Sequence, residues 1–151
     1  MAKKTARAEL LRELALAFGA SSRAFKADTD AILRDHDLTG PLGGLIWELD
    51  PAAEPPAMKD LAVVLRCDRS NVTALVERLV QRGLAERHED PADRRSKVVR
   101  LTASGVRLRS AIMRQLVAGS AFTPLSDEEL VTLLALLRRV SGADEPGPRP
   151  R

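Results

Sequence analysis

Residues 90–105, Asp-Pro-Ala-Asp-Arg-Arg-Ser-Lys-Val-Val-Arg-Leu-Thr-Ala-Ser-Gly, carry more structural information than any other stretch of this 151-residue chain. Turn-forming and basic residues come first, an apolar strand follows over 97–101, and Thr102 then begins a helix. A second short strand is predicted over 84–88, before the polar loop. The stretch therefore predicts a β-hairpin with a cationic tip, packed beside a helical body.

Positive charge is concentrated around this hairpin. No Asp or Glu occurs between Arg94 and Ser126, and the basic residues there are Arg94, Arg95, Lys97, Arg100, Arg107, Arg109 and Arg114. A local excess of this kind favours a polyanionic partner, for which DNA phosphate is the common choice. Because the net charge of the whole chain is only +3, the clustering carries this inference and the overall balance does not.

The bulk composition indicates one soluble domain. Aromatic residues make up 3% of the chain, so the core must consist of Leu, Val and Ala, which favours helices. The single Cys67 excludes an internal disulfide and suits a reducing compartment. We find no apolar run of membrane-spanning length and no secretory leader, and we expect a cytoplasmic protein without a membrane partner.

Long helices are predicted at both ends of the chain. Over 8–35, Leu11, Phe18, Phe25 and Ile32 recur every seven residues, a seam pattern that favours pairing with a second subunit over an ordinary intrachain core stripe. Further helices are predicted over 103–119 and from a capping box at Ser126 to about residue 140. Segments 1–7 and 142–151 are expected to be flexible and disordered, respectively.

The centre of the chain predicts a helix-turn-helix followed by a wing. A short helix over 58–65 precedes a tight turn and a stronger helix over 70–82, which Gly83 ends. The polar residues near the start of the second helix could enter the major groove of DNA and reach base edges or phosphates. On Ser70 alone an ordinary helix cap is the better interpretation, but the whole run followed by a cationic hairpin favours DNA. The candidates are Arg69, Ser70, Asn71, Thr73 and the outward-facing Arg78.

The sequence resembles the MarR family of winged-helix regulators. The resemblance implies a mainly α fold with a small β-hairpin wing, in a single domain over 8–141. Its winged helix-turn-helix would span about 42–101, with dimerisation helices over about 8–35 and 103–141. The residues that carry it are Leu61-Ala62, Cys67-Asp68-Arg69-Ser70-Asn71-Val72-Thr73, Leu75-Val76, Arg78-Leu79, Arg82-Gly83-Leu84, Arg87, Asp93-Arg94-Arg95, Leu101-Thr102 and Gly105.

The same resemblance implies roles for the hairpin tip. Arg95 would enter the minor groove and Asp93 would orient it through a charge-assisted hydrogen bond, while Arg94 and Lys97 would contact phosphates. The alternative for Asp93 and Arg95 is a surface ion pair that only orders the hairpin. Thr102 is interpreted as a helix cap, and Gly105 as a residue that permits close packing against the hairpin.

Two features bear on regulation. Gly43 and Gly44 could enlarge an effector pocket floored by Trp47, with His36 nearby, although close helix packing is the favoured explanation of the glycines. Relatives that sense oxidants usually carry the reactive cysteine in the first helix, where this chain has none. Cys67 is therefore interpreted as a small, buried apolar residue.

Enzymatic function is disfavoured. His36 and His88 lie on different elements, and the chain has no HExxH or CxxC motif and no glycine-rich phosphate loop after a strand. We expect no cofactor and no metal. The prediction is a homodimeric repressor of a pseudo-palindromic operator, released by a small-molecule effector. The alternatives are a winged-helix scaffold for protein interactions and a non-specific DNA-binding protein.

Overall fold

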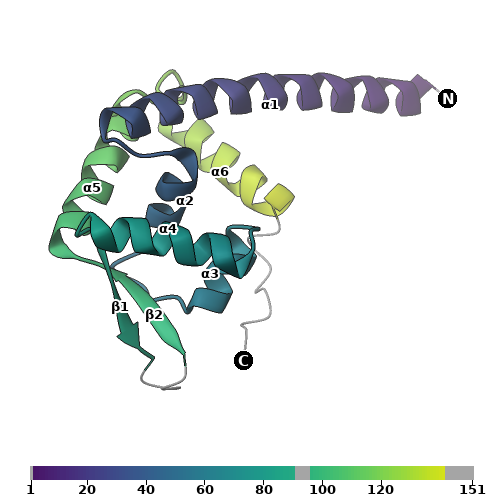
Figure 1. Cartoon of the computed structure of the whole chain (residues 1–151). Coiled ribbons are helices and arrows are strands. Elements are labelled where there is room, and N and C mark those ends of the chain that lie inside the picture. The colour runs from purple at the N-terminus through teal and green to yellow at the C-terminus, as the bar shows by residue number, and fades with distance from the viewer. Residues whose placement is uncertain (1, 91–95, 142–151) are drawn as a thin grey trace.

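The computed structural model describes residues 2–90 and 96–141 of the chain, with side chains from residue 6 onwards. Within these ranges it contains six helices and one two-stranded antiparallel sheet (Figure 1). The elements follow in the order α1 (Ala2–Asp35), α2 (Gly40–Glu48), α3 (Met58–Val64), α4 (Arg69–Gln81), β1 (Ala85–Glu89), β2 (Lys97–Leu101), α5 (Ala103–Ala118) and α6 (Asp127–Ser141). The predicted fold class, mainly α with a β-hairpin wing, is confirmed.

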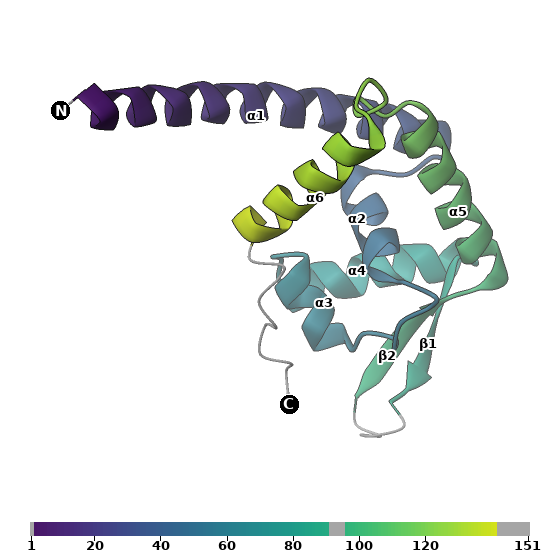
Figure 2. The same ribbon diagram turned by 180° about the vertical axis from the view of Figure 1, so that it is seen from behind.

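The molecule has a long arm at one side and a wing at the other. Helix α1 extends far beyond the body, and the hairpin projects from the opposite side, with α4 between them (Figures 1 and 2). None of the helices in the described ranges combines the length and the apolarity that a lipid bilayer requires.

The core lies between α2, α4, the hairpin and α5. Leu45 and Ile46 of α2 are fully buried with Val72, Val76 and Leu79 of α4. Leu61 of α3, Val99 of the wing and Ile112 of α5 also belong to this cluster, and α1 adds Leu33 near its end, with Ile32 packed against it. Because α4 buries one apolar stripe, its opposite face is presented to solvent.

One prediction about a helix start is wrong. Helix α1 begins at Ala2 instead of residue 8, so the expected flexible N-terminus is helical from Ala2 on. Ala, Lys and Arg in this segment all favour a helix, and no Gly or Pro precedes Gly19. Thr39 does occupy the N-cap position of α2, but its side chain makes no capping hydrogen bond to the described residues.

The base of the wing is closed by a compact set of contacts that the sequence predicts. Gly83 has a φ of +66° and ends α4, while the Leu84 N–H donates to the Leu79 carbonyl at 2.9 Å. The Thr102 hydroxyl donates to the Gly83 carbonyl at 2.7 Å and accepts the Gly105 N–H at 3.1 Å. Gly105 lies so close to the hairpin that a Cβ there would overlap the Leu84 carbonyl oxygen.

We predict that Gly105→Ala lowers the free energy of unfolding by about 3 kcal/mol, because the overlapped atom belongs to the backbone and cannot rotate away. Gly44→Ala is the matched control, since the nearest atom to its Cβ would be Leu65 Cδ2 at 3.7 Å. Alanine inside α2 should raise stability by about 0.5–1 kcal/mol. Urea denaturation measures both values, and a Gly105→Ala variant as stable as the wild type would contradict the close approach.

Candidate nucleic-acid interface

The first turn of α4 presents the polar side chains that the sequence singles out. Arg69, Ser70 and Asn71 are all exposed, directly after a turn in which Arg66 adopts a φ of +49°. The Asp68 side chain makes no capping hydrogen bond to the described residues. The first backbone N–H groups of α4 therefore receive no bond from this side chain, and they lie at the positive end of the helix dipole. This end of the helix can therefore accept an anion or insert into a groove.

Thr73 is half-buried and contributes less than predicted. Its hydroxyl donates to the Arg69 carbonyl at 2.9 Å, within the helix. Its own carbonyl accepts the Arg87 guanidinium at 3.3 Å. The hydroxyl hydrogen is therefore already used, and only the oxygen of Thr73 could act toward a ligand.

Arg87 of β1 connects the wing to α4, a role that no sequence pattern assigns to it. Its Nη2 lies 3.3 Å from the Thr73 carbonyl and 3.6 Å from the Glu77 carboxylate, and its side chain is 33% exposed. Because the two partners lie one turn apart on α4, this guanidinium fixes the angle between the hairpin and the helix. Arg87 thus positions the hairpin relative to α4.

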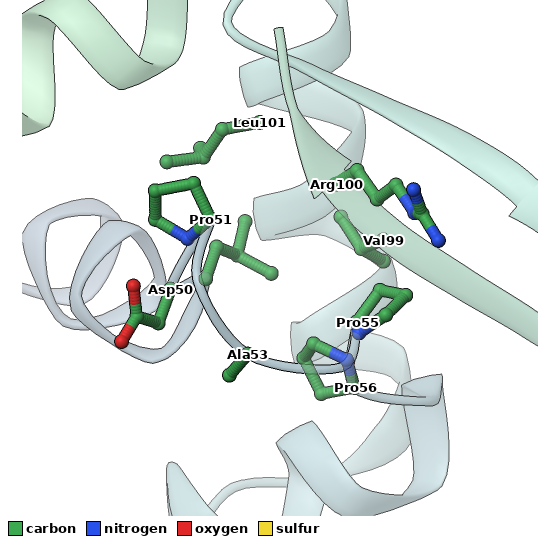
Figure 3. Close-up of a pocket in the computed structure, with 9 residues that line it drawn as sticks. Asp50, Pro51, Ala53, Pro55, Pro56, Val99, Arg100 and Leu101 are labelled. Atoms are coloured by element: carbon green, nitrogen blue, oxygen red, sulfur yellow. The ribbon is translucent and has the colours of Figure 1, made fainter.

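The other edge of the wing is held by the loop that follows α2. The Val99 N–H donates to the Pro56 carbonyl at 3.2 Å, and Ala57 pairs with Val98 as an isolated bridge. This loop and β2 enclose a cavity of about 200 Å³ lined by prolines and by Leu101 (Figure 3). The hairpin is thus anchored to the body on both sides.

The wing itself is described only in part. Lys97 pairs with Glu89 at 3.1 Å, directly across the hairpin register, and remains half-exposed. An exposed pair of this kind is worth about 0–1 kcal/mol and can be exchanged for a phosphate contact. Asp93, Arg94 and Arg95 lie outside the described residues, so their roles stay predictions.

Arg78 lies two turns after Asn71 on the same side of α4, at a cavity between that helix and α2. The cavity has a volume of about 580 Å³, and Asn71 and Cys67 also line it. Cys67 is half-buried instead of enclosed in the core. The remaining lining residues are Pro41, Gly44, Leu65, Ala74 and Leu75.

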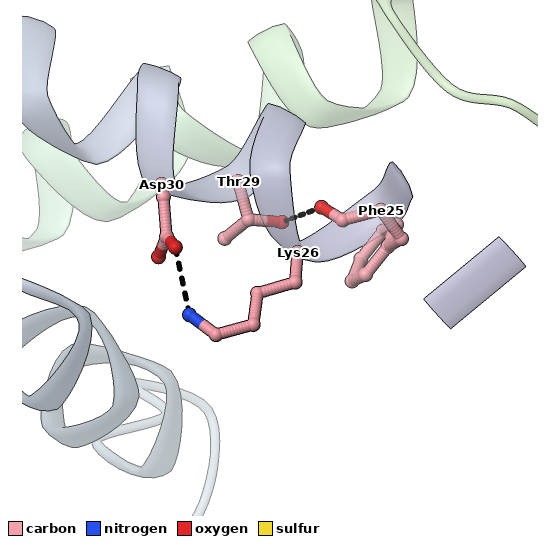
Figure 4. Close-up of polar contacts among 4 residues, drawn as sticks. All are labelled: Phe25, Lys26, Thr29 and Asp30. Carbon is pink, nitrogen blue, oxygen red and sulfur yellow. Dashed lines mark hydrogen bonds and ion pairs between the residues drawn. The ribbon is translucent and has the colours of Figure 1, made fainter. Parts of the chain in front are cut away.

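A third cavity, of about 420 Å³, lies between α1 and α2, and Trp47 is among its lining residues. Polar groups of α1 also line it, among them Lys26, whose ammonium pairs with Asp30 at 2.7 Å (Figure 4). The expectation for His36 is wrong, because His36 does not line this cavity. Its Nε2 lies 3.1 Å from Gln115 Oε1 of α5.

The preference for close packing holds for only one of the paired glycines. A Cβ at Gly43 would lie 2.5 Å from Leu33 Cδ1, and Leu33 is buried. A Cβ at Gly44 would be at an ordinary van der Waals distance from its nearest neighbour, and Gly44 lines the cavities of about 580 Å³ and 420 Å³. Gly43 therefore permits the contact between α1 and α2, whereas Gly44 leaves space open.

Apolar side chains lie exposed along α1 and α6. Leu11 and Phe18 of the predicted seam are 53% and 56% exposed, and Leu14 beside them is 61% exposed. Helix α6 lies wholly within the described residues, and none of its residues is buried. The exposed apolar side chains there include Val131, Leu134, Leu136 and Val140. Groups of exposed apolar side chains of this kind often mark a site of protein interaction.

Comparison with known proteins relates the chain to transcriptional regulators. Residues 36–96 match the MarR family. The "Putative transcriptional regulatory protein for hcr operon" of Thauera aromatica is 36% identical over 115 residues, covering 72% of this chain and 68% of that protein. The HTH-type transcriptional repressor NicR of Pseudomonas putida is 34% identical over 94 residues, covering 60% of this chain and 59% of that protein.

Solved structures share the fold. CouR from Rhodococcus jostii RHA1, bound to p-coumaroyl-CoA, superposes with a TM-score of 0.71 at 23% identity, covering 84% of this chain and 90% of that one. A cysteine-to-serine mutant of MarR from E. coli, complexed with operator DNA, gives a TM-score of 0.65 at 24% identity over 85% of this chain and 93% of that one.

We predict that Arg87→Ala lowers the free energy of unfolding by about 1 kcal/mol, because it removes one long charge-assisted hydrogen bond and a partly exposed ion pair. Arg100→Ala on β2 is the matched control, since Arg100 is exposed and has no ion pair among the described residues. Its effect should stay within about 0.5 kcal/mol. Equal losses in the two variants, in urea denaturation, would remove the positioning role of Arg87.

Proposed function

Because the chain belongs to the MarR family of winged-helix transcriptional regulators, we propose that it is a homodimeric repressor that binds a pseudo-palindromic operator and is released by a small molecule. The observation that carries the proposal is the exposed polar start of α4, held beside an anchored hairpin. A scaffold for protein interactions would not require arginine and asparagine at this position together with a cationic hairpin.

The start of α4 is the element proposed to enter the major groove. That groove is about 12 Å wide and admits one helix, which contacts bases through its N-terminal residues. Asn71 can make a bidentate contact with adenine, and Arg69 can contact guanine or a phosphate. Ser70 and the backbone N–H groups of the first turn would bind phosphate, as would Arg78, Arg94 and Lys97. Arg95 would enter the adjacent minor groove, oriented by Asp93.

The exposed apolar side chains of α1 and α6 support the proposal of a second subunit. Leu11, Leu14 and Phe18 lie on one stripe of a helix that packs against the body only near its end. Pairing of these surfaces in a two-fold dimer, together with α5, would remove them from water. The two α4 helices would then lie about 34 Å apart on one face of the DNA and contact successive major grooves.

Release by a small molecule is supported by the cavity between α1 and α2. Trp47 and Phe25 offer it aromatic surface, and it lies between the proposed dimerisation arm and the winged part of the chain. A ligand that binds one separation of these parts better than another would shift the population toward it. The bound p-coumaroyl-CoA of CouR and the repressor function of NicR lend support by similarity.

We predict that Asn71→Ala weakens binding to a duplex enriched from a random pool by about 1–3 kcal/mol, or roughly 5- to 150-fold, and relaxes the preference at one base pair of each half-site. Lys97→Ala should weaken binding to all sequences alike and reduce the salt slope by about one. Gln81→Ala, at the other end of α4, is the control. An Asn71→Ala variant that discriminates bases as the wild type does would contradict the proposed docking of α4.

We predict that Leu14→Glu and Phe18→Glu convert the protein to a monomer, because a carboxylate would have to be buried in the apolar seam without a partner. Ala20→Glu places the same charge on the opposite side of α1 and should leave the dimer intact. Sedimentation equilibrium at micromolar concentration separates the cases. Dimers of unchanged affinity in both seam variants would exclude this surface as the interface.

A further inference from the structure

The side chain of one residue connects the C-terminal end of α4 with the C-terminal end of α1. Arg82, the C-cap residue of α4, donates from Nη1 to the Asp37 carbonyl at 2.6 Å and from Nη2 to the His36 carbonyl at 3.0 Å. Both acceptors belong to the turn that follows α1. A planar guanidinium that binds two successive carbonyls holds them in one orientation, which a single donor cannot do.

The turn that Arg82 binds is also held from a third element. His36 contacts Gln115 of α5 through its ring, at 3.1 Å. Asp37 has a φ of +55°, and the Leu38 N–H donates back to the Leu33 carbonyl at 2.8 Å. The turn is therefore held by several contacts, and the C-terminal ends of α1, α4 and α5 meet at it.

We propose that Arg82 is a positioning residue that sets the angle between the α1 arm and the winged part of the chain, and through it the position of α4 on DNA. This inference rests on the proposed function where it concerns operator affinity, but the angle itself does not depend on DNA. Arg82 lies at the opposite end of α4 from Asn71, so it acts on the interface without touching it.

The length of α4 converts a small tilt at one end into a large displacement at the other. Helix α4 has 13 residues, which at about 1.5 Å per residue makes it about 20 Å long. A tilt of about 5° at the Arg82 end would move its first turn by about 2 Å over that length. Base contacts depend on hydrogen bonds whose heavy-atom distances span only about 0.5 Å. Loss of the Arg82 contacts should therefore weaken operator binding even though α4 itself remains folded.

The angle can be measured directly with two nitroxide labels in one chain. Ala20→Cys on the arm and Lys59→Cys on α3, both exposed, provide the sites in a Cys67→Ser background. Mixing the doubly labelled protein with an excess of unlabelled protein ensures that each measured pair of labels belongs to a single chain. Pulsed electron resonance should give one narrow distance distribution with Arg82 present. Arg82→Ala should broaden or shift it, Arg82→Lys should give an intermediate result, and Arg114→Ala, which removes an exposed arginine from α5, should leave it unchanged.

Operator titration with the same variants, without labels, supplies the second readout. Arg82→Ala should lower affinity by about tenfold at an unchanged salt slope, because no phosphate contact is lost. A distance distribution identical to that of the wild type would overturn the proposal, as would a salt slope reduced by about one, which marks a phosphate contact. A shifted distribution in a protein that binds no DNA would support the role of Arg82 and contradict the proposed function. Circular dichroism at the working temperature verifies that each variant is folded.

Discussion

The fixed rotation of α4 about its own axis is the constraint on which the rest of the structure depends. Val72, Val76 and Leu79 are fully buried with Leu45 and Ile46 of α2, so the helix can present only one face to solvent. That face carries the polar first turn. Any rotation that turned Asn71 inward would expose this apolar stripe and bury polar atoms without partners, at a cost of several kcal/mol. The position of the proposed DNA-binding surface is therefore a consequence of core packing.

The wing follows from the same helix. Gly83 ends α4 in a left-handed turn, Thr102 binds the Gly83 carbonyl, and Gly105 lets α5 approach the hairpin. Arg87 then ties β1 to the exposed side of α4. Helix and hairpin are thus joined into one unit by these contacts, whereas α1 leaves the body as an arm with exposed apolar residues. Arg82 forms a polar tie between the unit and this arm, and a change in their angle would move both elements of the interface together.

Much of this arrangement was predictable from the sequence, and the exceptions share a physical cause. Glycine, capping threonine and apolar periodicity act through local backbone geometry, so Gly83, Thr102 and the stripe of α4 could be assigned from their neighbours in the chain. The contacts of Arg82 and Arg87 are not predictable in this way, because each guanidinium binds a backbone carbonyl of another element, which no side-chain pattern marks. The position of His36 could not be predicted either, because its partner, Gln115, lies 79 residues away in the sequence. The expected roles of Asp93, Arg94 and Arg95 still rest on the family resemblance.

Selection of bound sequences from a random double-stranded DNA pool tests the central claim, that two copies of this chain recognise DNA sequence together, most directly. The account predicts enrichment of a two-fold-symmetric site whose half-site centres lie about one helical turn, or roughly 10 bp, apart. Salt-sensitive binding without any enriched sequence would contradict it and identify a non-specific DNA-binding protein. The absence of all binding would contradict it as well and favour a winged-helix scaffold.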